Sequence, residues 1–237
     1  MTVQWPLAGE VHIRLINLAI SEADLSGLER LLAPDERERA DRLIVRQVRN
    51  RFVAARGLLR RILGSYLELE PGTLTLKTNQ YGKPFLPERP DRQRLDFNLS
   101  HSADLAILAL TERCEVGIDL EQVRDGLPFQ DMARQFFSRQ EQWDLFSLPL
   151  NLQLAAFYRC WTRKEAYLKG YGNGFSQPAD FCDVSLLPGQ PPELLAHRTN
   201  PDQPSRWSLT DLEVPPTFCA TLAVRNKFPV IHIFPSP

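Results

Sequence analysis

The sequence predicts an α+β protein built as two similar α/β halves that divide near residue 115. A helical segment and several strand-like segments occur before this point, and a second set follows it. Strands are predicted where apolar and polar residues alternate, and helices where apolar residues recur every three or four positions. A helix-and-sheet unit that occurs twice indicates that ligands bind where the two units meet. We therefore expect an N-terminal half at residues 1–115 and a C-terminal half at residues 116–237.

Composition and charge narrow the class of protein. The chain of 237 residues has 43% apolar and 24% charged residues, which is typical of a globular protein. A net charge of −1 gives no overall attraction to nucleic acid or to an anionic membrane surface. The four cysteines form no CxxC pair, and neither a signal peptide nor a run of about 18 apolar residues is present. We expect a monomeric cytoplasmic protein that has neither nucleic acid nor a membrane among its partners.

The first half is predicted to contain one long helix that packs on a sheet. Residues Val11–Leu18 alternate as a strand does. Pro34 and the acidic residues that follow it suit a helix N-terminus, and an apolar stripe extends from Ile44 to Leu63. A continuous helix is therefore expected over Pro34–Leu63, with its many arginines on the other faces.

The rest of the chain is predicted to supply a meander, two helices and a second set of strands. Short turns separate the three strands expected for an antiparallel meander, which are Leu95–Ser100, Leu105–Leu110 and Cys114–Glu121. Two helices are expected next, the second of which Gly170 ends, and they are Phe129–Phe146 and Leu152–Lys169. The final strands are expected at Phe181–Leu187, Arg206–Leu212 and Phe218–Val224.

The segment Val116–Glu121 places two carboxylates on one face of a strand. Its period of two puts the apolar residues on one side and Gly117, Asp119 and Glu121 on the other. Adjacent carboxylates suit Mg²⁺, which takes one or two carboxylates together with phosphate oxygens and water. Gly117 lacks a Cβ and would let a phosphate or a partner backbone approach closely. The alternative is a half-exposed strand whose polar face is acidic.

The segment Trp161–Lys169 adds a third acidic residue and a lysine on one helical face. Glu165 and Lys169 stand one turn apart, and Lys164 is next to Glu165 in the chain. Glu165 is a candidate third metal ligand. Alternatively, Glu165 and Lys169 form an ordinary i,i+4 ion pair on a solvated helix, where Lys169 also complements the helix dipole.

Three further residues are candidates for binding phosphate. Ser100 and His101 lie at the end of a predicted strand and can donate hydrogen bonds to a pyrophosphate. Lys83 lies between a glycine and a proline in a predicted turn and would project from a fixed backbone. Each residue has a structural alternative, because hydroxyls and imidazoles also stabilise turns and Gly-Lys-Pro is an ordinary tight turn.

Arginines supply local positive charge on the predicted long helix. Acidic residues are largely confined to its first turn, so Arg39, Arg51 and Arg56 are available to phosphates. The alternative is a solvated basic helix face. No glycine-rich P-loop or GxGxxG segment competes for the phosphate-binding role.

Four segments, taken in order, resemble the signature of the Sfp-type 4'-phosphopantetheinyl transferases. They are Gly82–Pro84, Phe97–Ser102, Val116–Glu121 and Trp161–Lys169. The last has the WxxKEA form, similar to cyanobacterial members of the family, rather than the KES form of the Bacillus enzyme. The resemblance covers roughly residues 30 to 225. It implies an α+β fold of two pseudo-symmetric α/β halves with the active site at their interface.

The resemblance also implies a role for each motif residue. The Mg²⁺ ion, for which Mn²⁺ can substitute, would be bound by Asp119, Glu121 and Glu165. The catalytic residues would be Glu165, Lys169 and Asp119. The substrate coenzyme A would be bound through its nucleotide and pyrophosphate by Arg39, Arg56, Lys83, Ser100, His101, Lys164 and Lys169.

The reaction implied is attack by a carrier-protein serine on the β-phosphate of coenzyme A, which releases 3',5'-ADP. Glu165, or a water that it orients, would accept the serine proton. The partner would be an apo acyl or peptidyl carrier protein of fatty-acid, polyketide or nonribosomal-peptide synthesis. One position departs from the Bacillus enzyme, because Glu36 stands where that enzyme has a lysine, and Arg56 would then supply the phosphate contact.

Two other classes of function are alternatives. A non-enzymatic coenzyme A or nucleotide-binding module would use Arg56, Lys83 and His101, but it would not need three carboxylates together. A nucleic-acid-binding protein would use the arginine-rich helix, but the net charge of −1 and the acidic residues oppose affinity for a polyanion.

Overall fold

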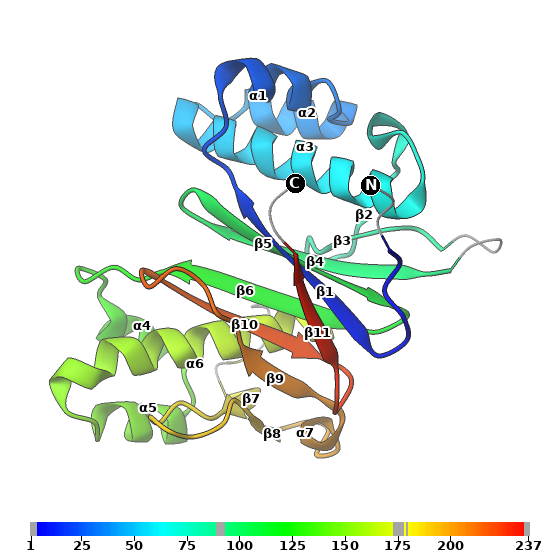
Figure 1. The fold of residues 1–237 in the computed structure, drawn as a ribbon. Coiled ribbons are helices and arrows are strands. Elements are labelled where there is room, and N and C mark those ends of the chain that lie inside the picture. The colour runs from blue at the N-terminus through cyan, green and yellow to red at the C-terminus, as the bar shows by residue number, and fades with distance from the viewer. Residues whose placement is uncertain (1–3, 89–92, 173–177, 179, 235–237) are drawn as a thin grey trace.

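The first sheet forms around the alternating segment near the N-terminus. The computed structural model describes residues 4–88, 93–172, 178 and 180–234. The first sheet has the strand order β11-β1-β5-β4 (Figure 1), with bounds β1 (Glu10–Asn17), β4 (Leu95–Ser102), β5 (Leu105–Glu112) and β11 (Val230–Phe234). The predicted first strand and the predicted hairpin of β4 and β5 are confirmed. The parallel pairing of β11 with β1 brings the end of the described chain back to the first sheet.

Three helices cover one face of this sheet, and the prediction of one continuous helix is wrong. They are α1 (Glu22–Glu29), which was not predicted, α2 (Pro34–Asp41) and α3 (Arg46–Leu67). The chain leaves helical geometry before α3, where Val45 has extended dihedral angles and Ile44 is 99% exposed. Two successive β-branched residues lower helix propensity, and an exposed Ile44 contributes no packing that would offset this cost. The buried stripe therefore begins inside α3.

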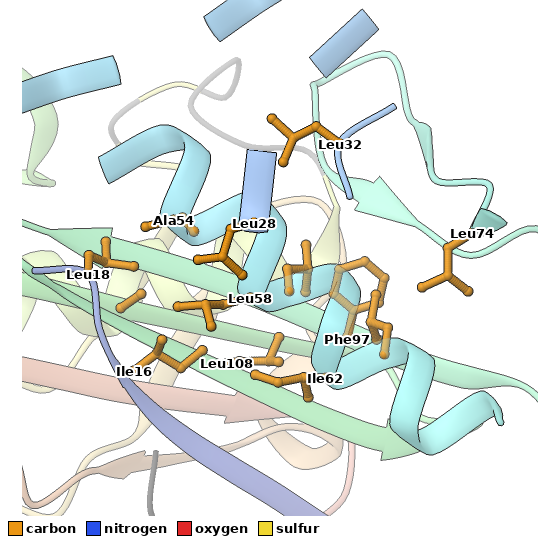
Figure 2. Close-up of a cluster of buried hydrophobic side chains, with 14 of the residues drawn as sticks. Ile16, Leu18, Leu28, Leu32, Ala54, Leu58, Ile62, Leu74, Phe97 and Leu108 are labelled. Carbon is orange, nitrogen blue, oxygen red and sulfur yellow. The ribbon is translucent and has the colours of Figure 1, made fainter. Parts of the chain in front are cut away.

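The buried face of α3 forms the first hydrophobic core. Figure 2 shows Leu58 and Ile62 of α3 lying against Phe97 and Leu108 of the sheet. Leu28 of α1 joins the same cluster next to Leu58 and packs against α3 at Gly57. Burial of such side chains, at about 1.5–3 kcal/mol each, stabilises the layer of helices on the sheet.

The second sheet contains the strand that carries the two predicted carboxylates. Its order is β6-β10-β9, and its strands are β6 (Val116–Gln122), β9 (Ser208–Asp211) and β10 (Phe218–Val224). The expected meander is therefore wrong for its third strand, because β6 pairs with β10 rather than with β5. Arg113, with a φ of 49°, lies in the turn that takes the chain out of the first sheet. Leaving that sheet lets the apolar face of β6 pack between the two sheets.

A second layer of helices covers the outer face of the second sheet (Figure 1), and it consists of α4 (Phe129–Phe136), α5 (Arg139–Phe146) and α6 (Leu150–Tyr171). The prediction of one helix over residues 129–146 is wrong. Ser138 starts a new helix with a capping box, in which its hydroxyl accepts from the Glu141 amide and the Glu141 carboxylate accepts from the Ser138 amide. The predicted helix over residues 152–169 is confirmed, but Gly172, with a φ of 90°, ends it two residues later than predicted.

Short elements complete the fold. They are a 3₁₀ turn η1 (Pro71–Thr73), β2 (Lys77–Thr78), β3 (Pro84–Phe85), β7 (Cys182–Val184), β8 (Leu194–His197) and α7 (Gln203–Arg206). The layers run helices, sheet, sheet, helices (Figure 1), which confirms the predicted α+β class. The predicted boundary near residue 115 lies between β5 and β6, and β11 is the strand after that boundary that joins the first sheet.

Gly117 lies where β6 and α6 come closest together. A Cβ at this position would stand 2.0 Å from the Ala166 carbonyl oxygen and 2.2 Å from the Gly170 amide nitrogen. Gly170 in turn faces the Trp207 ring, which a Cβ at that position would meet at 2.6 Å. The sequence offered two reasons for Gly117, and the structure supports the approach of a partner backbone, because only glycine leaves room for the helix.

A Cβ at Gly117 should therefore destabilise the fold strongly. We expect Gly117→Ala to lower the free energy of unfolding by about 3 kcal/mol or more, because the clashing atoms are backbone atoms that cannot rotate away. Gly126→Ala is the matched control, since a Cβ there meets nothing within 4 Å, and it should change stability by less than about 0.5 kcal/mol. Urea unfolding followed by circular dichroism measures both, and equal stabilities for the two variants would contradict the close approach.

Candidate active site

Asp119 is the buried centre of the site. Its side chain faces α6 from β6 and the residue is 2% exposed. Its Oδ1 accepts from Lys169 Nζ at 2.6 Å and from the Ser100 hydroxyl at 3.0 Å. Its Oδ2 is buried and has no hydrogen-bond partner. A buried carboxylate oxygen without a partner is costly, so this atom is positioned to accept a ligand.

Glu165 of α6 reaches the same place from the helix side. The residue is 7% exposed, and its buried Oε1 also has no hydrogen-bond partner. Burial raises the pKa of Glu165 to about 8, and the nearby charge of Asp119 adds to the shift. Lys169 forms its ion pair with Asp119 across two elements. Because Glu165 is buried, the alternative of a solvated i,i+4 pair on an exposed helix does not describe this face of α6.

The acidic residues and Lys169 act on one another electrostatically. Burial raises the pKa of Glu121, and the charge of Asp119 raises it further. Burial alone would lower the pKa of Lys169, but Asp119 and Glu165 outweigh it and bring the pKa above its ordinary value. Lys169 is therefore a permanent cation within an acidic group, which is the arrangement expected of a residue that neutralises phosphate charge.

The acidic group has the donor chemistry for a divalent cation, although it is not already gathered as a metal cluster. Within the described ranges, no set of three His, Cys, Asp or Glu side chains is close enough to form a metal-binding group. Two buried carboxylate oxygens, Asp119 Oδ2 and Glu165 Oε1, nevertheless have no hydrogen-bond partner. Mg²⁺ prefers a few carboxylate oxygens and completes its shell with water and phosphate oxygens. The residues present therefore fit Mg²⁺, and its assignment to Asp119, Glu121 and Glu165 stays a prediction.

Positive charges gather around His101. Desolvation lowers the pKa of His101, and the charges of Lys169, Arg51, Arg39 and Arg56 lower it further. These cations come from α2, α3 and α6, so helices of both layers supply them. Four cations near one imidazole are a local concentration of positive charge in a chain whose net charge is −1.

Glu36 forms ion pairs with two arginines of α3. Its carboxylate, which is 4% exposed, lies 3.0 Å from Arg56 Nε and 2.5 Å from Arg60 Nε. Arg60 is fully buried and also donates to the Leu74 and Pro71 carbonyls, so its role is to brace α3. Arg56 remains partly exposed at 18% of its side chain. The single negative charge of Glu36 compensates only one of the two arginine charges. The uncompensated positive charge lies on the side of the partly exposed Arg56.

Lys83 connects the turn before β3 to both elements of the acidic site. Its half-buried ammonium donates to the Val116 carbonyl at 3.0 Å and lies 3.4 Å from the Gly170 carbonyl oxygen. Burial lowers its pKa to about 8, although the nearby Asp96 opposes the shift. Lys83 also lines a pocket together with Asp96, Val116 and Gly170. Its predicted contact with the nucleotide remains a prediction.

The structure takes Lys164 away from the predicted site. Its ammonium donates to Glu141 Oε2 at 2.7 Å and to the Cys182 carbonyl at 2.6 Å, and the residue is 6% exposed. Adjacent residues on a helix point about 100° apart. Since Glu165 faces β6, Lys164 faces α5 and β7 instead. These contacts connect α6 to α5 and β7, and they give no support to the assignment of Lys164 to coenzyme A binding, which stays a prediction.

Sequence reasoning did not assign Ser102, which contacts the acidic group, or Asn98, which contacts the backbone of the strand that carries this group. Ser102 Oγ donates to Glu121 Oε2 at 3.0 Å, and Asn98 Oδ1 accepts from the Ile118 amide at 2.8 Å. The signal that could have found them is the alternation of polar residues at positions 98, 100 and 102. A strand with alternating polar residues presents them all on one face.

Two sheets that meet at an acidic group, with a group of cations beside it, suit a protein that handles a phosphate-bearing substrate. The comparisons agree with this class. The family described as "4'-phosphopantetheinyl transferase superfamily" matches residues 115–223, and the family described as "4'-phosphopantetheinyl transferase, N-terminal" matches residues 19–113. The chain belongs to the 4'-phosphopantetheinyl transferase family.

Individual relatives support the same assignment. The 4'-phosphopantetheinyl transferase HetI of Nostoc sp. is 40% identical over 219 residues, which cover 92% of this chain and 89% of that protein. The 4'-phosphopantetheinyl transferase Sfp of Bacillus subtilis is 31% identical over 156 residues, which cover 65% of this chain and 66% of that protein. A putative 4'-phosphopantetheinyl transferase of Synechocystis sp., slr0495, is 34% identical over 152 residues, which cover 64% of this chain and 61% of that protein. The resemblance inferred from the four motifs is thus confirmed.

The half-buried ammonium of Lys83 should make stability depend on pH in a defined direction. Its pKa is about 8 in the folded protein and 10.5 for an ordinary lysine, so the unfolded chain binds more protons between these values. Relative to a Lys83→Met variant, the free energy of unfolding of the wild type should therefore rise with pH across this window, by up to about 1.4 kcal/mol per pH unit. Below the window both states are protonated and the difference should be constant.

Urea unfolding of both proteins at a series of pH values measures this difference. Because other titrating groups are shared, their contributions cancel in the comparison. A difference that stays flat, or that falls as the pH rises, would show that the Lys83 ammonium is not buried as described.

Proposed function

We propose that this protein transfers the 4'-phosphopantetheine arm of coenzyme A to a serine of an apo acyl or peptidyl carrier protein and releases 3',5'-ADP. The observation that carries this proposal is the meeting of two motif segments, since Lys169 of α6 binds Asp119 of β6 at 2.6 Å beside the buried carboxyl of Glu165. Phosphoryl transfer requires acidic ligands for a metal and a fixed cation within one site. Relatives named as 4'-phosphopantetheinyl transferases support the same activity.

The acidic group is the proposed metal site. Asp119, Glu121 and Glu165 would bind Mg²⁺, or Mn²⁺ in its place, through oxygens that include the two without partners. When bound, the metal would neutralise charge on the pyrophosphate of coenzyme A. Ser100 and Lys169 orient the Asp119 carboxylate independently of the metal, because both bind its Oδ1.

The group of cations is the proposed anchor for coenzyme A. Lys169 and His101 would bind the pyrophosphate, and Arg39 and Arg56 would lie near the 3'-phosphate. Ser100 and Lys83 would help to bind the nucleotide. The substrate would then lie across the interface of two pseudo-symmetric α/β halves, residues 1–115 and 116–237. The cations that surround His101 support this placement, because they come from both helical layers.

The carrier serine has two candidate proton acceptors within the same group. One is the Glu165 carboxylate, through an oxygen that the metal would leave free. The other is a water that Glu165 orients. In either case Lys169 stays protonated, because Asp119 and Glu165 raise its pKa. Lys169 therefore serves as an electrostatic stabiliser of the transferring group.

We also propose that the protein is a monomer, that it acts in the cytoplasm, and that neither nucleic acid nor a membrane is among its partners. Cys114, Cys160, Cys182 and Cys219 are free thiols, which suits a reducing compartment. None of the helices in the described part of the chain combines the length and low polarity that crossing a bilayer requires. A binding module without activity is less well supported, because it gives no reason for burying Asp119 and Glu165 together.

Removal of one carboxylate charge should abolish transfer. We expect Asp119→Asn and Glu165→Gln each to lower the rate of carrier loading by about 100-fold or more, because each loses a metal ligand while keeping the shape of the side chain. Apo carrier proteins incubated with enzyme, coenzyme A and Mg²⁺ and then weighed by mass spectrometry would show the gain of one phosphopantetheine arm. EDTA should also prevent the gain.

The matched control for this experiment is Glu213→Gln, which neutralises an exposed carboxylate outside the site. It should load carriers at the wild-type rate. Circular dichroism establishes that each variant is folded. A folded Asp119→Asn or Glu165→Gln variant with near-normal turnover at saturating Mg²⁺ would show that the metal assignment is wrong, and a wild type that loads no carrier would overturn the proposed activity.

Arg56 should distinguish coenzyme A from dephospho-coenzyme A, which lacks the 3'-phosphate. A hydrogen bond to a charged group contributes roughly 1.5–3 kcal/mol. Arg56→Ala should therefore weaken binding of coenzyme A about tenfold more than binding of dephospho-coenzyme A. Partial exposure of Arg56 and its pairing with Glu36 favour the lower end of this range. Calorimetric titration of both proteins with both ligands completes the thermodynamic cycle.

Equal losses for the two ligands would mean that Arg56 braces α2 against α3 and does not bind the 3'-phosphate. Arg61→Ala provides a control on the same helix, because Arg61 is exposed. It should leave the ratio of the two affinities unchanged.

A further inference from the structure

Two edge strands from different sheets face each other at the candidate site. β4 ends the first sheet and β6 ends the second. On one side β6 pairs with β10, so alternate backbone N–H groups of β6 point to the other side, toward β4. These N–H groups belong to Ile118, Leu120 and Gln122. Buried N–H groups require acceptors, and no backbone ladder joins β4 to β6.

Side chains of β4 supply the acceptors in place of a backbone ladder. The Ile118 amide donates to Asn98 Oδ1 at 2.8 Å, and the Leu120 amide donates to Ser100 Oγ at 3.3 Å. The Gln122 amide donates to Ser102 Oγ at 3.0 Å. All three bonds join residues 20 positions apart, so the two strands advance in step. We call Asn98, Ser100 and Ser102 the β4 polar row.

Two members of the β4 polar row also bind the acidic group. Ser100 Oγ donates to Asp119 Oδ1, and Ser102 Oγ donates to Glu121 Oε2, each at 3.0 Å. A serine hydroxyl has a single proton. Since the backbone N–H occupies an acceptor position of the Ser102 oxygen, the proton is directed to Glu121 and orients that carboxylate.

Asn98 differs from Ser102 because no carboxylate directly precedes its partner residue on β6. It makes the same kind of bond to the β6 backbone, but the β6 residue before its partner is Gly117, which has no side chain. Asn98 therefore contributes to joining the two sheets and does not touch a carboxylate. Ser102 contributes both to the joint and to the orientation of Glu121.

We propose that Ser102 is a positioning residue that fixes the Glu121 carboxylate for metal binding. This inference rests on the proposed function, in which Glu121 is a metal ligand. A partner that orients a ligand in this way commonly contributes 10- to 100-fold, roughly, to metal affinity.

The test uses direct binding of Mn²⁺, measured by the loss of the free-ion electron paramagnetic resonance signal, with coenzyme A present and no carrier protein. Ser102→Ala should raise the dissociation constant of Mn²⁺ about tenfold. Ser102→Thr keeps the hydroxyl and should bind within about threefold of the wild type. Asn98→Ala should lower the urea midpoint, as Ser102→Ala does, but should leave Mn²⁺ binding unchanged.

Each outcome decides the proposal. Unchanged Mn²⁺ affinity in folded Ser102→Ala, or an equal loss in Asn98→Ala, would overturn the positioning role and leave the proposed transfer activity standing. Failure of the wild type to bind Mn²⁺ would overturn the metal site and this inference together. Carrier loading by the wild type, followed by mass spectrometry, shows separately whether the transfer activity itself is present.

Discussion

The close packing of β6 on α6 is the constraint on which the candidate site depends. Gly117 and Gly170 remove side chains where the strand and the helix touch, so their backbones approach to a distance that no larger residue allows. Asp119 follows Gly117 by two residues and Lys169 precedes Gly170, so this contact brings their side chains within 2.6 Å. Asp119 and Lys169 therefore contact each other because the backbones of β6 and α6 are in close contact.

The same packing buries several carboxyl groups whose negative charge is only partly compensated when no ligand is bound. Burial of neighbouring carboxyl groups raises the pKa of Glu165 and of Glu121, and Lys169 provides one compensating charge. Among the described residues, Asp119 Oδ2 and Glu165 Oε1 are two of the buried carboxylate oxygens that have no hydrogen-bond partner. Proteins tolerate such groups mainly at functional sites, where a ligand supplies the interaction that the fold omits. The features that are least favourable for folding are thus the ones with the donor chemistry for a divalent cation.

Positive charge is distributed differently from negative charge. Glu36 pairs with both Arg56 and Arg60, and Asp104 pairs with Arg51, so much of the arginine-rich surface is already compensated. Near His101, Glu36 leaves one of the two charges of Arg56 and Arg60 uncompensated, and Arg39 adds a further cation. A local surplus binds a compact anion, whereas an extended polyanion requires a continuous basic surface. A chain with a net charge of −1 thus still has a local concentration of positive charge on this side of the molecule.

Local sequence patterns determined the faces of the main elements. The period of two in Val116–Glu121 gave the correct buried and acidic faces of β6, and the four motifs identified the family. Faces are predictable from sequence because side-chain direction follows directly from the backbone period. The predicted long helix failed at Val45 and the predicted single helix at Ser138, where short local signals interrupt an apolar pattern.

Tertiary structure alone decided which elements pair and what each polar residue meets. The pairing of β6 with β10, and of β11 with β1, joins segments far apart in the chain, and no local period specifies such partners. Lys164 and Glu165 are neighbours in sequence, yet the helix turns one toward Glu141 and the other toward Asp119. Ser102 became part of the site because two sheet edges meet there. Sequence fixes the direction in which a side chain leaves its own element, whereas the atom that it contacts depends on long-range packing of apolar surfaces.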